Sequence, residues 1–296
     1  MDNEFILFDR LEVIRKTIQE YGEENFCLSF SGGKDSTVLH HLLDMALPEN
    51  RIPRVFINTG IEYVDIVKFV KALAEKDDRF VIVNNRRNIK NTLEQYGYPF
   101  KSKIHSKWVD IYQRNGKNKA TENYLGEGEK ELYRKCPQDL KYQFTDLCTL
   151  RISDKCCLKM KEEPFSNWQK ENNKQIRIVG VMRAEGGRRM KAKCLAFNGN
   201  KLSHFQPLAV ISKEWEEWFI DQYNVNLCRL YYEPFNFERT GCKGCPFTIK
   251  LQEQLETLEK YLPNERKQCE ILWKPVYDEY RRLGYRLKKG EQAKLF

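Results

Sequence analysis

The sequence predicts an α/β protein: a Rossmann-like parallel sheet flanked by helices, with a mostly helical carboxyl-terminal region. Short runs rich in β-branched and aromatic residues alternate with segments of helical period as far as Val181. From about Ile249 onward, apolar residues recur at helical spacing alone. Strands that alternate with helices form βαβ units, and such units build a parallel sheet.

Periodicity and turn residues predict most elements in order. A helix is expected at 4–21, where apolar side chains recur every three or four residues. Strands are expected at 26–30, 54–57, 80–83 and 175–181, and helices at about 36–46, 62–75, 88–96 and 213–223. Two tail helices from about 249 to 283 are expected to break near Pro263. The polar, glycine-containing stretch 115–130 predicts a mobile loop in the role of a lid.

Length and composition predict a cytoplasmic protein that does not enter a membrane. The chain has 296 residues, 41% of them hydrophobic, and no run approaches the ~18 apolar residues of a membrane span. The start, Met1 to Glu4, is acidic and lacks the basic region of a signal peptide. We expect one domain over 1–248, with a helical extension over 249–296. Ten cysteines in such a chain point to metal binding or catalysis rather than disulfides.

The net charge of +9, from 51 basic and 42 acidic residues, suits an anionic partner. A nucleotide, sulfate or a nucleic acid would each fit such an excess of positive charge. Any single lysine is more often part of a solvated surface, so the charge by itself selects no site.

The stretch Phe26–Thr37 joins a buried strand to a helix through a glycine turn. The paired glycines lack a Cβ, so the backbone there can approach a ligand closely. The helix start offers unpaired N–H groups and the positive end of the helix dipole, and Lys34 adds a full charge. The sequence therefore predicts an anion site. It is not a Walker A loop, because Asp35 follows the lysine and Leu28 stands where that motif needs glycine.

The run Ser31-Gly32-Gly33-Lys34-Asp35-Ser36 resembles the PP-loop of the ATP-pyrophosphatase superfamily. Members of that superfamily bind the β,γ-phosphates of ATP in this loop and open the α–β bond. The resemblance implies an adenine nucleotide bound with Mg²⁺. The expected nucleotide-binding residues of the loop are Ser29, Ser31, Gly32, Gly33, Lys34, Asp35, Ser36 and Thr37. Ligands of parallel sheets lie beyond the carboxyl ends of strands, so Asn58, Thr59, Gly60 and Glu62 join this prediction.

Two cysteine pairs, Cys156-Cys157 and Cys242 with Cys245, form the second candidate site. Four thiolates can hold either a tetrahedral zinc ion or an iron–sulfur cluster. Adjacent cysteines seldom both reach one zinc ion, whereas a cubane cluster offers each of them a different iron. The pattern therefore favours a cluster, with zinc and free thiols as the alternatives.

The order of the later segments resembles the phosphoadenosine/adenosine phosphosulfate reductase family. The segments are Cys156-Cys157 with Lys161 and Pro164-Phe165, then Gly180–Glu185, Pro207-Leu208 and Gly241–Cys245. The resemblance covers roughly residues 24–248 and implies an adenine nucleotide α-hydrolase-like fold. It also implies a [4Fe–4S] cluster on Cys156, Cys157, Cys242 and Cys245. It places Lys161, Arg183, Arg188 and Arg189 at the anionic end of the substrate, with Lys34, Asp35, Arg183 and Arg188 as catalytic residues.

Two departures from that family point toward ATP rather than sulfate reduction. The reductases carry a catalytic cysteine in a carboxyl-terminal Glu-Cys-Gly-Leu-His motif, and residues 288–296 contain none. Their loop is usually a degraded PP-loop, whereas the loop here is complete.

The expected function is therefore an enzyme that binds ATP or an adenylyl nucleotide and cleaves it at the α-phosphate. Its cluster would serve in sulfur transfer or in the modification of a nucleotide or nucleic acid, as in sulfur-inserting branches of the superfamily. The sequence does not name the acceptor. The alternatives are a sulfonucleotide reductase with a different thiol, and a nucleotide-sensing or nucleic-acid-binding component without turnover. The expected partners are an adenine nucleotide, a sulfur donor protein or thioredoxin-like reductant, and a nucleic acid.

Overall fold

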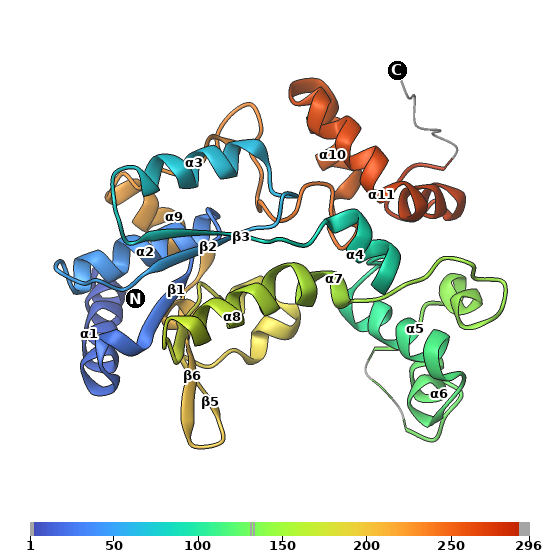
Figure 1. Ribbon diagram of the computed structural model, residues 1–296, viewed down its shortest axis with the longest axis horizontal. Coiled ribbons are helices and arrows are strands. Elements are labelled where there is room, and N and C mark those ends of the chain that lie inside the picture. Colours follow the sequence, from blue (N-terminus) through green and yellow to red (C-terminus); the bar gives the residue numbers. More distant parts are fainter. Residues whose placement is uncertain (1–2, 131, 133, 290–296) are drawn as a thin grey trace. The chain divides into compact units, whose positions relative to one another are not determined.

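The computed structural model describes residues 3–130, 132 and 134–289 (Figure 1). The strands are β1 (Phe26–Ser29), β2 (Arg54–Asn58), β3 (Phe80–Asn84), β4 (Ile176–Ile178), β5 (Leu195–Asn198) and β6 (Lys201–Phe205). The first helices are α1 (Asn3–Tyr21), α2 (Lys34–Ala46), α3 (Val64–Ala74), α4 (Ile89–Tyr96), α5 (Lys103–Asn115) and α6 (Lys119–Leu125). The later helices are α7 (Lys155–Cys157), α8 (Glu163–Glu171), α9 (Lys213–Gln222), α10 (Leu251–Tyr261) and α11 (Pro263–Leu283).

The six strands form one sheet in the order β3-β2-β1-β4-β6-β5. Every neighbouring pair is parallel except β5 with β6. The chain moves outward from β1 to β3 and then returns to place β4 on the other side of β1. Such a reversal, beyond the carboxyl ends of β1 and β4, marks the place where open parallel sheets bind ligands.

The two faces of the sheet follow from the alternation of side chains along each strand. One face packs against α8, in a cluster of Cys27, Val55, Ile57, Phe165 and Trp168. Arg54 alternates to the other face and reaches His40 and Asp44 of α2. Figure 1 shows α8 and α2 on opposite sides of the sheet. Burial on both faces explains why the strands read as nearly continuous apolar runs.

The chain divides into two compact units that interleave along the sequence. The first comprises Met1–Asn58, Glu62–Asn84 and Pro164–Gly241, and it contains the whole sheet. The second comprises Thr59–Ile61, Asn85–Glu163 and Cys242–Phe296, and it is built from helices. Because these units are defined by contacts, the expected domain boundary after residue 248 stays a prediction.

The fold class predicted from the sequence is confirmed, and two local expectations need correction. The expected loop at 115–130 contains α6, whose first turn is closed by a reciprocal capping box between Asn118 and Thr121. The hairpin of β5 and β6 was not predicted at all. Its loop is Gly199-Asn200, a two-residue hairpin signal in which Gly199 has a φ of 59°. No described helix combines the length and the apolar character that crossing a bilayer requires.

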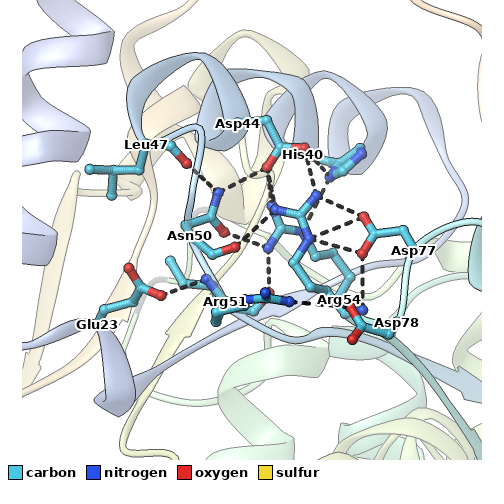
Figure 2. A network of polar contacts seen from close by, with 11 residues as sticks. Glu23, His40, Asp44, Leu47, Asn50, Arg51, Arg54, Asp77 and Asp78 are labelled. Atoms are coloured by element: carbon cyan, nitrogen blue, oxygen red, sulfur yellow. Dashed lines mark hydrogen bonds and ion pairs between the residues drawn. The ribbon is translucent and has the colours of Figure 1, made fainter.

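A polar network at the amino-terminal ends of β2 and β3 ties α2 to the sheet (Figure 2). The Asp44 carboxylate accepts hydrogen bonds from Arg54 at 2.5 Å, from Arg79 at 2.8 and 3.0 Å, and from Asn50 at 2.9 Å. The Arg54 side chain is fully buried and also donates to His40 Nδ1 at 3.2 Å. Burial raises the pKa of Asp44, but Arg79 and Arg54 outweigh it and hold that pKa below its ordinary value. Asp44 is thus the carboxylate that pairs directly with the buried Arg54.

We predict that Asp44→Asn lowers the free energy of unfolding by about 2 kcal/mol, because it leaves the buried Arg54 charge without its counter-ion. Urea denaturation of the purified protein measures this loss. Asp78→Asn is the matched control, because Asp78 and its partner Arg51 are both largely exposed and 3.7 Å apart. Such a surface pair contributes at most about 1 kcal/mol. Equal losses in the two variants would contradict the prediction.

The second unit contains a buried histidine with a partner on each ring nitrogen. His105 is 0% exposed, with Nδ1 at 3.0 Å from the Tyr124 hydroxyl and Nε2 at 2.6 Å from Gln143 Oε1. Because an amide oxygen only accepts, Nε2 carries the proton and Nδ1 accepts from the tyrosine. Burial lowers the pKa of His105 to about 4. The ring is therefore neutral at physiological pH and belongs to the core.

We predict that His105 makes the protein less stable as the pH falls. Its folded pKa lies below its ordinary value, so its contribution is complete above about pH 6.5 and is lost toward pH 4. The total loss is on the order of 3 kcal/mol. His105→Gln removes this titration, so the stability difference between wild type and variant should shrink between pH 7 and pH 4.5 in urea melts. A difference that is the same at both pH values would contradict the prediction.

Candidate functional site

The glycine turn after β1 brings the amino terminus of α2 close to the segment that follows β4. Gly32 has a φ of 70°, and a Cβ there would lie 2.9 Å from Ile66 of α3. Gly33 is the residue before the first helical turn. On the β4 side, a Cβ on Gly180 would lie 3.0 Å from the backbone carbonyl of Asp35. Glycine at position 32 therefore lets the turn pass against α3, and glycine at position 180 lets the backbone after β4 approach the start of α2.

Hydroxyl groups of the loop satisfy its backbone. Ser31 N–H donates to the Ser36 hydroxyl at 3.2 Å, and the two serine hydroxyls lie 3.0 Å apart. Gly33 N–H donates to the Ser31 hydroxyl at 3.2 Å. The hydroxyls of Ser36 and Thr37 both donate to the Gly33 carbonyl at 2.9 Å. The loop is therefore held in one conformation by its own side chains.

A tyrosine that the sequence did not single out completes the loop. Lys34 N–H donates to the Tyr231 hydroxyl at 3.0 Å, and that hydroxyl lies 2.6 Å from Thr240 Oγ1. Burial raises the pKa of Tyr231 to about 12, so the hydroxyl stays protonated. Tyr231 and Thr240 come from the segment just before the Cys242 turn, which carries no recognisable nucleotide motif.

Three charged side chains meet at the start of α2. Lys34 Nζ lies 3.4 Å from Glu216 Oε2, and Glu216, on α9, is 1% exposed. Burial and the negative charge of Asp35 raise the pKa of Glu216 to about 7. Burial also raises the pKa of Asp35, while the charge of Arg239 opposes that rise. The sequence did not identify Glu216 or Arg239 as site residues. Both follow the last strand, whereas the loop follows the first, so they lie far from the loop along the chain.

The remaining predicted nucleotide-binding residues lie at the end of β2 and just after it. Asn58 ends β2 and donates from its amide to Asn84 Oδ1, at the end of β3, at 2.9 Å. Glu62 is buried in the same unit. Thr59 and Gly60 belong to the second unit, so their part in a nucleotide site stays a prediction.

The predicted anion-binding arginines contact the protein itself. Arg183 donates from Nε to the Ala192 carbonyl at 2.6 Å, and Arg189 forms an ion pair with Glu185. The Arg188 side chain lies outside the described part of the structure. Arg239 also pairs with Glu185 while its charge acts on Asp35, so Arg239 is the arginine near the loop that the structure identifies. The roles of the other three stay predictions.

The four predicted cysteine ligands come together within the second unit. Burial raises the pKa of Cys156, and the charges of Cys242, Cys157 and Cys245 raise it further. Burial, Cys242 and Cys157 likewise raise the pKa of Cys245. The positive charge of Lys161 opposes both rises. Thiols that interact electrostatically in this way lie near one another, although the two pairs are far apart in the sequence.

Helix α11 supports the turn that carries Cys242 and Cys245. Three fully buried aromatic side chains donate to its backbone carbonyls: Trp273 to Lys243 at 3.0 Å, Tyr277 to Gly244 at 2.5 Å, and Tyr280 to Pro246 at 2.8 Å. Cys245 N–H donates to the Cys242 carbonyl at 3.2 Å and closes the turn. This turn is therefore fixed before any metal binds.

The backbone around Cys156 is irregular. Cys156 is the middle residue of the short helix α7, and a π-helical turn follows at Leu158–Glu162. Such turns are uncommon and frequent at functional sites. In the described part of the chain, no group of three or more histidine, cysteine, aspartate or glutamate side chains is arranged to hold a metal ion. As a donor set, however, four thiols fit a soft metal or an iron–sulfur cluster; Cys156 is buried and the other three are partly buried.

The sheet and its glycine loop define an α/β protein of the PP-loop class. The sequence profile of the phosphoadenosine phosphosulfate reductase domain matches residues 25–130 and 129–248. The chain therefore belongs to the phosphoadenosine phosphosulfate reductase family, as its motifs predicted.

Among known proteins, the chain is 26% identical over 274 residues to an uncharacterized protein of Methanocaldococcus jannaschii. The match covers 91% of this chain and 53% of the relative, so the chain spans about half of the relative's length.

Three enzymes are among the solved structures with a similar fold. Phosphoadenylyl-sulfate reductase from Candida auris is 12% identical, with a TM-score of 0.43, over 78% of this chain and 93% of that one. The NH3-dependent NAD synthetase from Campylobacter jejuni is 13% identical, with a TM-score of 0.42, over 96% and 97%. The U34-tRNA thiolase NcsA from Methanococcus maripaludis, solved with its [4Fe–4S] cluster, is 16% identical, with a TM-score of 0.40, over 99% and 83%.

Proposed function

We propose that the protein is an ATP-using enzyme of the phosphoadenosine phosphosulfate reductase family that cleaves at the α-phosphate and uses an iron–sulfur cluster in sulfur transfer. The observation that carries this proposal is the complete PP-loop at the switch point of the sheet, where Gly33 and Lys34 N–H groups already point to oxygen acceptors. Phosphate oxygens can replace hydroxyl oxygens as the acceptors of these bonds. The acceptor of the sulfur would be a nucleotide or a nucleic acid.

The chain's own residues supply phosphate binding and orientation. The amino terminus of α2 presents its dipole and its N–H groups to the β,γ-phosphates. Lys34 adds a charge-assisted contact, which is stronger than a neutral hydrogen bond. The hydroxyls of Ser36 and Thr37 hold the Gly33 carbonyl and so keep the loop backbone in place while a phosphate takes the N–H groups.

A Mg²⁺ ion fits the carboxylates beside the loop. Neither carboxylate oxygen of Glu216 has a hydrogen-bond partner among the described residues, and Asp35 lies within its electrostatic reach. Mg²⁺ takes oxygen ligands and is commonly held by one or two carboxylates together with substrate phosphates. When bound, it would neutralise charge on the departing pyrophosphate. Asp35 and Glu216 would hold it.

A [4Fe–4S] cluster suits the four thiols of Cys156, Cys157, Cys242 and Cys245. When bound, it would supply redox or sulfur chemistry. Zinc on the same thiols is the alternative. The chain would then also need a sulfur donor protein or a thioredoxin-like reductant as partner. A sulfonucleotide reductase with another thiol, and a nucleotide-binding component without turnover, are the competing functions; the completeness of the loop favours ATP.

We predict that the protein binds ATP with Mg²⁺ and releases pyrophosphate when its acceptor is present. Lys34→Ala should weaken ATP binding by about 2 kcal/mol, because it removes a charge-assisted contact to phosphate. Calorimetry measures the affinity, and labelled ATP and labelled adenosine phosphosulfate distinguish pyrophosphate release from sulfite release.

Lys213→Ala is the control, because Lys213 is exposed at the start of α9 and has no contact with the loop lysine. Unchanged ATP affinity in Lys34→Ala would show that the loop does not bind phosphate. Sulfite from adenosine phosphosulfate would establish the reductase instead, and nucleotide binding with neither product would favour the component without turnover.

We predict that protein purified without oxygen is brown and holds about four irons and four sulfides per chain, as a cubane requires. Cys242→Ser should lose this colour and lower the melting temperature, because the cluster joins two segments far apart in the sequence. Iron and sulfide analysis with visible absorption measures the outcome.

Cys148→Ser is the matched control, since Cys148 lies in the same unit outside the predicted ligand set. It should keep the colour. One equivalent of zinc without visible absorption would replace the cluster by a tetrathiolate site. Free thiols in a stable, active protein would exclude both metal sites.

A further inference from the structure

Glu216 is a buried acidic side chain of the first unit. It lies on α9, whose neighbours Trp215 and Phe219 are buried, and it is itself 1% exposed. Neither of its carboxylate oxygens has a hydrogen-bond partner among the described residues. An ionised carboxylate in such a place loses its hydration, and the loss is large unless a counter-charge lies near. The nearest cation is Lys34 Nζ, at 3.4 Å.

This arrangement balances the charge of the loop in the ligand-free protein. The loop's own lysine faces Glu216, while Asp35, the next residue, brings a second carboxyl group into the same place. Arg239 acts on Asp35 from a largely exposed position. Two carboxyl groups therefore stand beside the single lysine that would receive a phosphate.

A polyphosphate that arrives alone meets repulsion at this point. Taking Lys34 as its partner would leave Glu216 buried without a counter-ion. Glu216 must then either take up a proton or stay charged beside another carboxyl group and new negative charge. Either outcome opposes binding of the bare anion; two unit charges a few ångströms apart repel by about 4 kcal/mol at an effective dielectric constant near 20. A divalent cation that enters with the polyphosphate removes the conflict by taking over the carboxylates.

We propose that Glu216 is a specificity-determining residue, which holds Lys34 when the loop is free and makes polyphosphate binding depend on an accompanying divalent cation. The inference rests on the proposed function in one respect, since it takes the loop to be a phosphate site. It goes further in assigning the selection of the metal-bound form over the bare polyphosphate to a residue outside the loop.

The competing explanation is structural. α9 packs on α2, so Glu216 would then only fix Lys34 and join the two helices. The two roles differ in what removal of the charge does. A structural tether, once neutralised, weakens binding with and without the cation alike. A residue that selects the cation, once neutralised, improves binding of the bare anion.

The test titrates wild type, Glu216→Gln and Glu217→Gln with ATP and, separately, with inorganic pyrophosphate by calorimetry. Each titration is run in excess Mg²⁺ and again in a chelator of divalent cations. Glu217 is the matched control, because it is the adjacent acidic residue on α9 and is exposed. Thermal melts accompany each variant, and Glu216→Leu, an apolar replacement, is the second variant should the glutamine variant not fold.

We expect wild type and Glu217→Gln to bind both probes at least about tenfold more tightly with Mg²⁺ than without it. In Glu216→Gln the metal-free affinity should rise about tenfold, so that the advantage of Mg²⁺ largely disappears. An unchanged Mg²⁺ advantage in a folded Glu216 variant overturns the inference, as does equal weakening in both solutions. If neither variant folds, a wild-type affinity that is the same with and without Mg²⁺ overturns it, and a clear Mg²⁺ advantage supports it.

The two probes separate this inference from the proposed function. Pyrophosphate binding with the expected Mg²⁺ dependence, without ATP binding, would overturn the nucleotide assignment and leave the role of Glu216 intact. Binding of ATP without any effect of Glu216 would overturn the inference and leave the proposed function. Failure of wild type to bind either probe would overturn both.

Discussion

The structure depends on one close approach, between the turn after β1 and the segment after β4. Gly32 takes a left-handed conformation beside Ile66, and Gly180 lies against the Asp35 carbonyl where a Cβ would not fit. Because β1 lies in the middle of the sheet, this approach places the start of α2 at the point where the strand order reverses. The positive end of the α2 dipole thereby lies at the carboxyl ends of the central strands.

The concentration of positive charge has to be balanced when no anion is bound, and the structure balances it with buried acid. Glu216 reaches Lys34 from a helix that follows the last strand, and Asp35 adds a second carboxyl group. At the amino-terminal ends of the strands, Asp44 balances the charges of Arg54 and Arg79 through hydrogen-bonded ion pairs. The contrast is informative, because the pairs around Asp44 are fully hydrogen-bonded while the oxygens of Glu216 are not. A fully hydrogen-bonded network contributes to stability, whereas carboxylate oxygens without hydrogen-bond partners beside a helix start are those a bound cation would use.

The second unit holds four cysteines that come from two segments far apart in the sequence. The aromatic side chains of α11 fix the Cys242 turn through its carbonyl oxygens, and Cys156 approaches from a helical segment interrupted by a π-turn. Bringing two such segments together costs chain entropy, and burial of Trp273, Tyr277 and Tyr280 contributes to offsetting it. The thiols are then close enough for their charges to interact, which raises the pKa of Cys156 and Cys245.

The sequence by itself determined the features that depend on neighbours along the chain. Alternating apolar runs predicted the parallel sheet, and the glycine turn predicted the junction between the first strand and its helix. The anion site at Lys34 and the cysteine ligand set stay predictions. Only the tertiary structure decided which distant residues complete the loop. Tyr231, Thr240, Glu216 and Arg239 carry no local signal, because a tyrosine or a glutamate on an amphipathic helix has the same sequence pattern whether it faces solvent or a buried lysine. Their roles arise from the packing of α9 and the segment before Cys242 around the start of α2, and long-range packing of this kind has no periodicity to read.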